Sequence, residues 1–136
     1  MPKMQGGCLC GQVRYSCDAE PFAQAVCHCA NCQRQAAAPF SVVLGVPEAS
    51  VEITGTLKTY EDKGDSGAVV YRRFCPECGS PILSQPGAMT GIVFLKAGTL
   101  DDTSWLDPKV HVWAKSKQAW TVLPEGVMAF DTVPGA

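Results

Sequence analysis

The chain has 136 residues, with 11 basic and 13 acidic side chains and eight cysteines. A net charge of −2 argues against a partner that is a nucleic acid or an anionic membrane, and 46% apolar residues exclude wholesale disorder. No apolar run approaches the roughly 20 residues of a membrane-spanning helix. The length predicts one domain over residues 1–136. Because the first residues lack the apolar core of a secretory signal, we expect a cytoplasmic protein.

Short segments of alternating or continuous apolar residues run through the chain and predict strands. They are 13–17, 23–27, 40–46, 51–53, 57–61, 69–74, 82–83, 91–96 and 110–114. A helical pattern is confined to residues 30–38, where Asn31 is a candidate cap and Pro39 ends the segment. Polar turns are expected at 63–67 and 124–130, and a loop at 101–108. Closely spaced strands with little helix predict a mainly β fold of antiparallel sheets.

The cysteines fall into close-set groups that favour a metal over disulfides. They stand as Cys8-x-Cys10, a lone Cys17, Cys27-x-Cys29-x-x-Cys32 and Cys75-x-x-Cys78. In a reducing compartment such thiols serve metal binding or catalysis more often than disulfides. Cysteines one residue apart also rarely reach the dihedral angle of a disulfide, whereas zinc gathers several sulfurs at about 2.3 Å. An iron site of the rubredoxin kind is a further alternative, and it would give a coloured protein.

The segment 74–79 forms a thiolate turn in which Pro76 stiffens the backbone and Gly79 permits a positive φ. Such a turn supplies two ligands, and a structural zinc takes four. The best donors of the other two are Cys8 and Cys10, which have glycines on both sides. We therefore expect a closed structural zinc site on Cys8, Cys10, Cys75 and Cys78.

The remaining cluster, Cys27, Cys29 and Cys32, offers three thiolates within six residues. Three protein ligands and one free position are typical of a catalytic zinc. Two alternatives stay open from spacing alone. A fourth ligand such as His28, His111 or Cys17 could close the site, or Cys29 and Cys32 could join the thiolate turn at Cys75 and Cys78.

Three segments together resemble a known family. They are Gly6-Gly7-Cys8-Leu9-Cys10-Gly11-Gln12-Val13-Arg14-Tyr15, Cys27-His28-Cys29-Ala30-Asn31-Cys32-Gln33-Arg34 and Phe74-Cys75-Pro76-Glu77-Cys78-Gly79-Ser80-Pro81. With matching segments at 97–102 and 108–120, the chain resembles the glutathione-dependent formaldehyde-activating (GFA) family and the centromere protein V-like zinc proteins. The resemblance implies a tent-like, zinc-stapled β fold with little helix. It also implies two zinc ions, a structural one on Cys8, Cys10, Cys75 and Cys78 and a catalytic one on Cys27, Cys29 and Cys32.

The resemblance further implies a carbon–sulfur lyase that acts on a thiol–aldehyde adduct, as in the formation of S-hydroxymethylglutathione from formaldehyde and glutathione. The chain departs from the family near the second cluster, where Gln33 replaces an arginine and Ala37 replaces a glycine. The missing arginine removes a contact for a substrate carboxylate. Because alanine takes a positive φ less readily than glycine, we expect a different backbone at position 37.

Three thiolates cancel the +2 charge of zinc and leave −1, which makes the metal a weak Lewis acid. A substrate thiolate at the free position is therefore a better interpretation than an activated water. We expect His28 to move a proton or donate a hydrogen bond to the substrate, unless it is an exposed residue that points away. Arg34 is expected to bind a substrate carboxylate, unless it is a solvated helix residue. His111 and Cys17 are interpreted as structural residues. The alternative function is a zinc-binding module that contacts a protein partner and has no enzymatic activity.

Overall fold

The computed structural model describes residues 3–64 and 67–133. Its elements are β1 (Met4–Gly7), β2 (Arg14–Cys17), β3 (Ala23–Cys27), α1 (Ala30–Ala36), β4 (Ser41–Pro47), β5 (Val51–Thr54), β6 (Lys58–Lys63), β7 (Val69–Phe74), β8 (Pro81–Pro86), β9 (Ile92–Lys96), β10 (Val110–Val112) and β11 (Met128–Ala129). Three short 3₁₀ turns cover Glu48–Ser50, Ala97–Thr99 and Ala114–Ser116. The prediction of a mainly β protein with little helix is confirmed. The turn expected at 63–67 includes two residues, 65 and 66, that lie outside the described residues.

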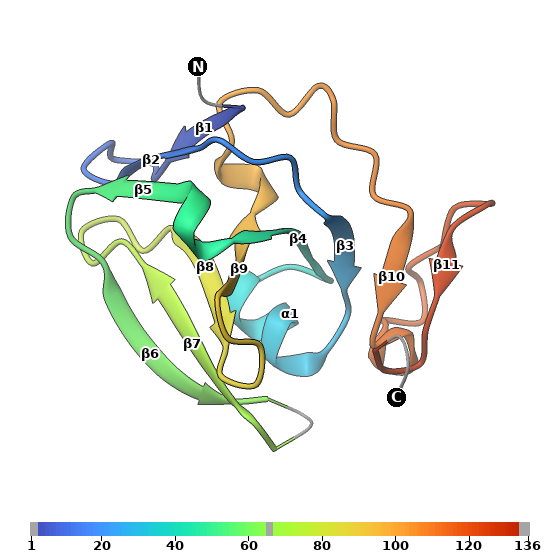
Figure 1. The fold of residues 1–136 in the computed structure, drawn as a ribbon. Coiled ribbons are helices and arrows are strands. Elements are labelled where there is room, and N and C mark those ends of the chain that lie inside the picture. Colours follow the sequence, from blue (N-terminus) through green and yellow to red (C-terminus); the bar gives the residue numbers. More distant parts are fainter. Residues whose placement is uncertain (1–2, 65–66, 134–136) are drawn as a thin grey trace.

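The strands form two sheets (Figure 1). The smaller has the order β1-β2-β5 and the larger has the order β11-β10-β3-β4-β9-β8-β7-β6. Pairing is antiparallel from β3 through β4, β9, β8 and β7 to β6, as predicted. Strand β10, however, runs parallel to both β3 and β11. A parallel neighbour requires a long crossover, here the chain from β3 to β10, and no local sequence pattern signals it.

Strand β1 was absent from the sequence prediction because its glycines have low strand propensity. It forms by pairing with β2, in a register that sets Gly6 opposite Tyr15. A side chain at position 6 would collide with the carbonyl oxygen of Thr99 and the ring of Tyr15, so the site requires glycine. The glycines near the first cysteine pair therefore serve close packing of the strand.

The main core lies between the two sheets. Its fully buried side chains include Val13, which precedes β2, Cys17 from the smaller sheet, and Leu44, Val93 and Leu95 from the larger sheet. Cys17 has no exposed surface and its sulfur lies 3.3 Å from the hydroxyl of Ser50, as expected of a structural cysteine. Within the described residues, no helix is long and apolar enough to cross a membrane.

Candidate metal centres

The first cysteine cluster joins the N-terminal segment to the middle of the chain. Cys8 and Cys10 follow β1, while Cys75 and Cys78 lie in the turn between β7 and β8. Their four sulfurs all lie within 4.8 Å of one another. The sulfurs of Cys8 and Cys10 are 3.6 Å apart, and those of Cys10 and Cys75 are 3.8 Å apart. A tetrahedral zinc with bonds of about 2.3 Å would separate its sulfurs by about 3.8 Å, so the four-cysteine centre fits this ion.

Neutral donors surround the four-cysteine centre. The amide of Val13 donates to the sulfur of Cys8, and the amide of Glu77 and the side chain of Gln12 donate to that of Cys75. The hydroxyl of Ser80 lies 3.3 Å from the sulfur of Cys78, and hydrogen bonds from Ser80 lower the pKa of that thiol to about 5. Gly79 has a φ of 80°, as its position after the thiolate turn predicted. These contacts favour thiolates, the form that binds a metal.

The second cluster sits where β3 leads into α1. Cys27 is the last residue of β3, Cys29 is the N-cap of α1 and Cys32 lies in the first turn of the helix. The Cys29 sulfur accepts the amide hydrogen of Cys32, and the three sulfurs lie within 4.8 Å of one another. Asn31 is therefore not the cap that the sequence suggested. A sulfur cluster this compact can hold one ion with three of its four tetrahedral positions filled.

The residues proposed as a fourth ligand lie elsewhere. Cys17 is in the main core, and the side chains of His28 and His111 contact each other. Among the described residues, no histidine, cysteine or carboxylate lies close enough to the three sulfurs to serve as a fourth ligand. Cys29 and Cys32 group with Cys27 and not with the thiolate turn. The three-cysteine centre thus has three candidate ligands, and it is distinct from the four-cysteine centre.

His28 is fully buried, so the expectation that it might be an exposed residue is wrong. Its Nε2 lies 2.9 Å from Nδ1 of His111, and the two rings are stacked with centroids 5.2 Å apart. Phe40 packs edge-on against the His28 ring. Burial lowers the pKa of both histidines, so both are neutral at pH 7. The structural assignment of His111 agrees with this pairing.

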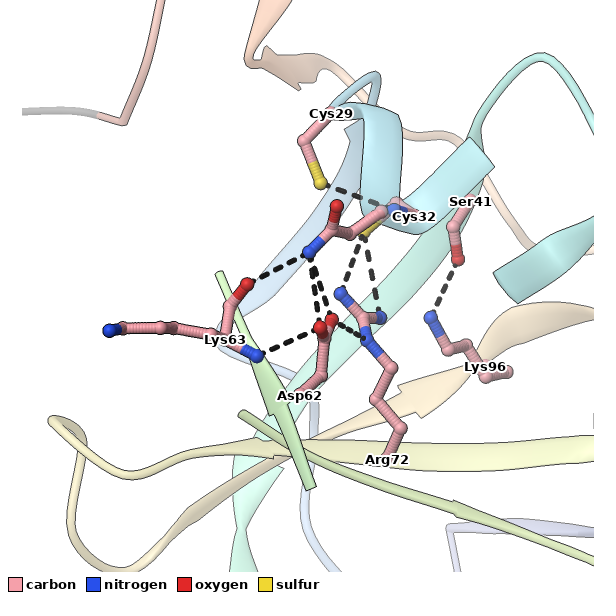
Figure 2. A network of polar contacts seen from close by, with 8 residues as sticks. Cys29, Cys32, Ser41, Asp62, Lys63, Arg72 and Lys96 are labelled. Carbon is pink, nitrogen blue, oxygen red and sulfur yellow. Dashed lines mark hydrogen bonds and ion pairs between the residues drawn. The ribbon is translucent and has the colours of Figure 1, made fainter. Parts of the chain in front are cut away.

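Two buried cations flank the three-cysteine centre, and the sequence analysis did not identify either. Figure 2 shows the guanidinium of Arg72 between Asp62 and Cys32, and the side chain of Lys96 directed at Ser41. Arg72 is 4% exposed and Lys96 is 6% exposed. Contacts with Cys27 and Cys29, and then the charges of Lys96 and Arg72, hold the pKa of Cys32 well below that of an ordinary thiol.

A shallow hollow of about 520 Å³ runs along α1, and none of the three cysteines is among its lining residues. Its lining includes Arg34, which is exposed, and Gln33. The Gln33 amide donates to the carbonyl oxygens of His28 and Ser116, so this residue ties the helix to the C-terminal segment. Ala37 ends the helix with a φ of 51°, in the left-handed region where a glycine is usual. Alanine therefore adopts here the positive φ that the sequence analysis assigned more readily to a glycine.

The chain is similar to known proteins in its fold and in its family signature. No curated protein matches the chain. A crystal structure of a protein from Rhodobacter sphaeroides shares the fold, with a TM-score of 0.59 and 19% sequence identity over 77% of this chain and 92% of the other. The model of the family described as "glutathione-dependent formaldehyde-activating enzyme" matches residues 3–116, which contain both cysteine centres. The chain belongs to the glutathione-dependent formaldehyde-activating enzyme family.

Proposed function

We propose that the protein is a zinc-dependent carbon–sulfur lyase that acts on a thiol–aldehyde adduct such as S-hydroxymethylglutathione. The observation that carries this proposal is the three-cysteine centre, where three buried sulfurs converge without a fourth side-chain ligand among the described residues. The four-cysteine centre has a full set of ligands and suits a structural ion. Residues 1–136 would act as one GFA-like domain, in the reducing cytoplasm that keeps such thiols free.

A zinc ion bound by Cys27, Cys29 and Cys32 would supply a fourth position where a substrate thiol is held as its thiolate. In the forward direction the sulfur of the substrate bonds to the aldehyde carbon and the carbonyl oxygen takes up a proton. The lyase direction breaks the same carbon–sulfur bond and returns the aldehyde. The three cysteines are buried, and charge interactions with a substrate are stronger in such a low-dielectric setting than in water.

Two further residues have proposed roles. Arg34 lines the hollow beside α1, where its exposed guanidinium can pair with a carboxylate of the substrate such as those of glutathione. The hydrogen-bonded histidine pair holds the His28 ring inside the protein. This pair uses only Nε2 of His28, and Nδ1 is buried without a hydrogen-bond partner among the described residues. We propose that His28 positions Cys27 and Cys29 and that Nδ1 is the atom that would contact a substrate.

The deciding experiment measures carbon–sulfur bond exchange. The zinc-loaded protein is mixed with ¹³C-formaldehyde and, in turn, glutathione, cysteine and 2-mercaptoethanol, and the rate of adduct exchange is read by NMR. We expect acceleration over the spontaneous rate with at least one thiol, and loss of that acceleration in the Cys29→Ser variant. Equal rates with and without protein, together with a protein side chain as fourth ligand in a metal-loaded crystal structure, would favour the non-enzymatic module.

A further inference from the structure

One face of the larger sheet carries a row of polar residues that leads to the three-cysteine centre. Residues opposite each other in a ladder share a face, and so do residues two apart in a strand. Cys27 on β3 is paired with Ser41 on β4. Lys96 on β9 is paired with Val43 on β4, which is two residues from Ser41. Phe94, two residues from Lys96 on β9, is paired with Ser84 on β8. Ser84 is in turn paired with Arg72 on β7. The register therefore places Lys96 and Arg72 on the same face as the ligand residue Cys27.

Arg72 is held in place by a chain of contacts that ends at a sulfur. Its Nε donates to Asp62 over 2.8 Å, while its two terminal nitrogens lie 3.9 and 4.0 Å from the sulfur of Cys32. Asp62 also accepts hydrogen bonds from the side chain of Asn31 and the amide of Lys63. The carboxylate thus fixes one edge of the guanidinium, and the other edge faces the cysteine.

Lys96 is a buried cation without a carboxylate partner among the described residues. Its Nζ donates to the hydroxyl of Ser41 over 2.9 Å, although an ammonium group has three hydrogens to donate. A buried charge without a counter-charge is strongly unfavourable. Burial lowers the pKa of Lys96, whereas the charges of Cys32, Cys27 and Cys29 act in the opposite direction. The three-cysteine centre is therefore the negative charge that favours the ammonium form.

The two cysteine centres differ in what surrounds their sulfurs. Backbone amides, Gln12 and Ser80 are the donors at the four-cysteine centre. At the three-cysteine centre, one amide hydrogen bond and the guanidinium of Arg72 contact the sulfurs, with Lys96 close by. A divalent ion with three thiolates carries a net charge of about −1, and a substrate thiolate would bring it to about −2. A buried centre with this charge needs cations close by.

We propose that Arg72 and Lys96 are positioning residues of the three-cysteine centre. Their positive charges stabilise the thiolates that bind the metal, and then the substrate thiolate. The part concerning the thiolate rests on the proposed function, and the part concerning the metal does not. Arg72 acts on Cys32 by direct contact. Lys96 acts through its charge, because it lies on the same face of the sheet as Cys27.

The experiment measures metal and thiol affinity in variants with matched controls. Lys96→Met removes the buried ammonium, and Lys58→Met removes an exposed one. Arg72→Leu together with Asp62→Asn removes the whole ion pair, so that no carboxylate is left unpaired, and Arg73→Leu is the control on the other face of β7. Lys96→Arg restores the charge. Metal content is measured against increasing chelator, and the cobalt-loaded proteins are titrated with 2-mercaptoethanol, which carries charge only on its sulfur.

We expect the Lys96→Met and the Arg72→Leu/Asp62→Asn proteins to lose one of two ions per chain at about 10- to 100-fold lower chelator strength, a range typical of residues that support metal ligands. The second ion, in the four-cysteine centre, should stay bound as in the wild type. The cobalt spectrum should respond to 2-mercaptoethanol at least tenfold more weakly in Lys96→Met, and Lys96→Arg should recover most of the response.

The two proposals fail in different ways. Metal and thiol affinities equal to those of Arg73→Leu and Lys58→Met in both variants would overturn the role of Arg72 and Lys96 and leave the lyase proposal standing. If the wild-type cobalt spectrum ignores 2-mercaptoethanol, cysteine and glutathione alike while the variants lose metal as expected, the lyase proposal is wrong and the two cations still support metal binding.

Discussion

The rings of His28 and His111 form a buried pair in which Nε2 of His28 lies 2.9 Å from Nδ1 of His111. One ring donates the hydrogen and the other accepts it, so at least one histidine must be neutral. His28 is the residue between Cys27 and Cys29, and His111 lies on β10, which pairs with β3. This contact links the cysteine-bearing segment to the C-terminal strands, and its strength depends on pH.

The histidine pair should make the folded protein less stable below about pH 6.5. Burial lowers the pKa of both rings below the ordinary value near 6.5. As the pH falls through that value, the unfolded chain takes up protons that the folded chain does not, so stability falls until the lowered pKa is reached. The slope is at most about 1.4 kcal/mol per pH unit for each histidine. Urea unfolding of the metal-loaded protein between pH 5 and 8 measures it.

The matched variant is His111→Gln, measured with the same metal content. Its stability should change less between pH 7.5 and 5.5 than that of the wild type, because one titrating group is gone. An identical pH slope in the two proteins would mean that His111 does not titrate on unfolding.

Replacing Ala37 by glycine should stabilise the protein by about 1 kcal/mol. Ala37 has a φ of 51°, a conformation that costs an alanine about 1–2 kcal/mol and a glycine almost nothing. The gain is partly offset because glycine gives the unfolded chain more freedom. Thermal unfolding measures the change. Ala38→Gly is the control, since the same substitution outside the left-handed region should lower stability or leave it unchanged. A less stable Ala37→Gly protein would contradict the observed backbone.

Replacement of a cysteine by serine should unfold the protein at the four-cysteine centre and only remove an ion at the three-cysteine centre. Cys75 has no exposed surface and packs in the main core, and its centre ties distant segments together. Cys75→Ser should therefore cost expression and cooperative unfolding, as expected where metal binding is coupled to folding. Cys29→Ser should stay folded and lose about one ion per chain. Circular dichroism and elemental analysis separate these results. A folded Cys75→Ser protein beside an unfolded Cys29→Ser protein would exchange the roles of the centres.

Arg34 should distinguish thiols that carry a carboxylate from those that do not. Because its exposed guanidinium lines the hollow along α1, Arg34→Leu should raise the KM for the glutathione adduct about tenfold, in the range of a hydrogen bond to a charged group. The KM for the 2-mercaptoethanol adduct should stay the same. An exposed arginine away from the hollow, Arg14, offers the control variant Arg14→Leu. Equal effects on both adducts would rule out a carboxylate contact at Arg34.

The cysteines that act together within each segment could be predicted from the sequence, because they are close in the chain. Spacing left open which segments share an ion, and the structure groups them. Spacing alone paired Cys8 with Cys10 and Cys75 with Cys78. Arg72 and Lys96 could not be found in this way. Arg72 and Arg73 are neighbours on β7, and alternation shows that they face opposite sides without showing which side holds the cysteines. Lys96 follows an apolar run and reads as its polar end until the register sets it beside Ser41.

The surroundings of His28 were also beyond local reasoning. Its partner lies 83 positions away, and the contact depends on the parallel pairing of β3 with β10. The helix cap was misassigned for a related reason. Cys29 takes the capping position with its sulfur, and this leaves Asn31 free to bind Asp62 on β6, a strand that is distant in the chain. In each case the sequence predicted the element, and contacts between distant segments decided what the side chain does.

The four-cysteine centre also constrains the unfolded chain. Its sulfurs on Cys10 and Cys75 stand 65 positions apart in the chain, so a bound ion closes a long loop in the way a disulfide does. Closing a loop of that length reduces the entropy of the unfolded chain by an amount worth about 4 kcal/mol. This cross-link forms and releases with the metal and needs no oxidant. The midpoint temperature of unfolding therefore depends on the free concentration of the ion. Without the ion, the smaller sheet would have to fold without this cross-link to the turn between β7 and β8.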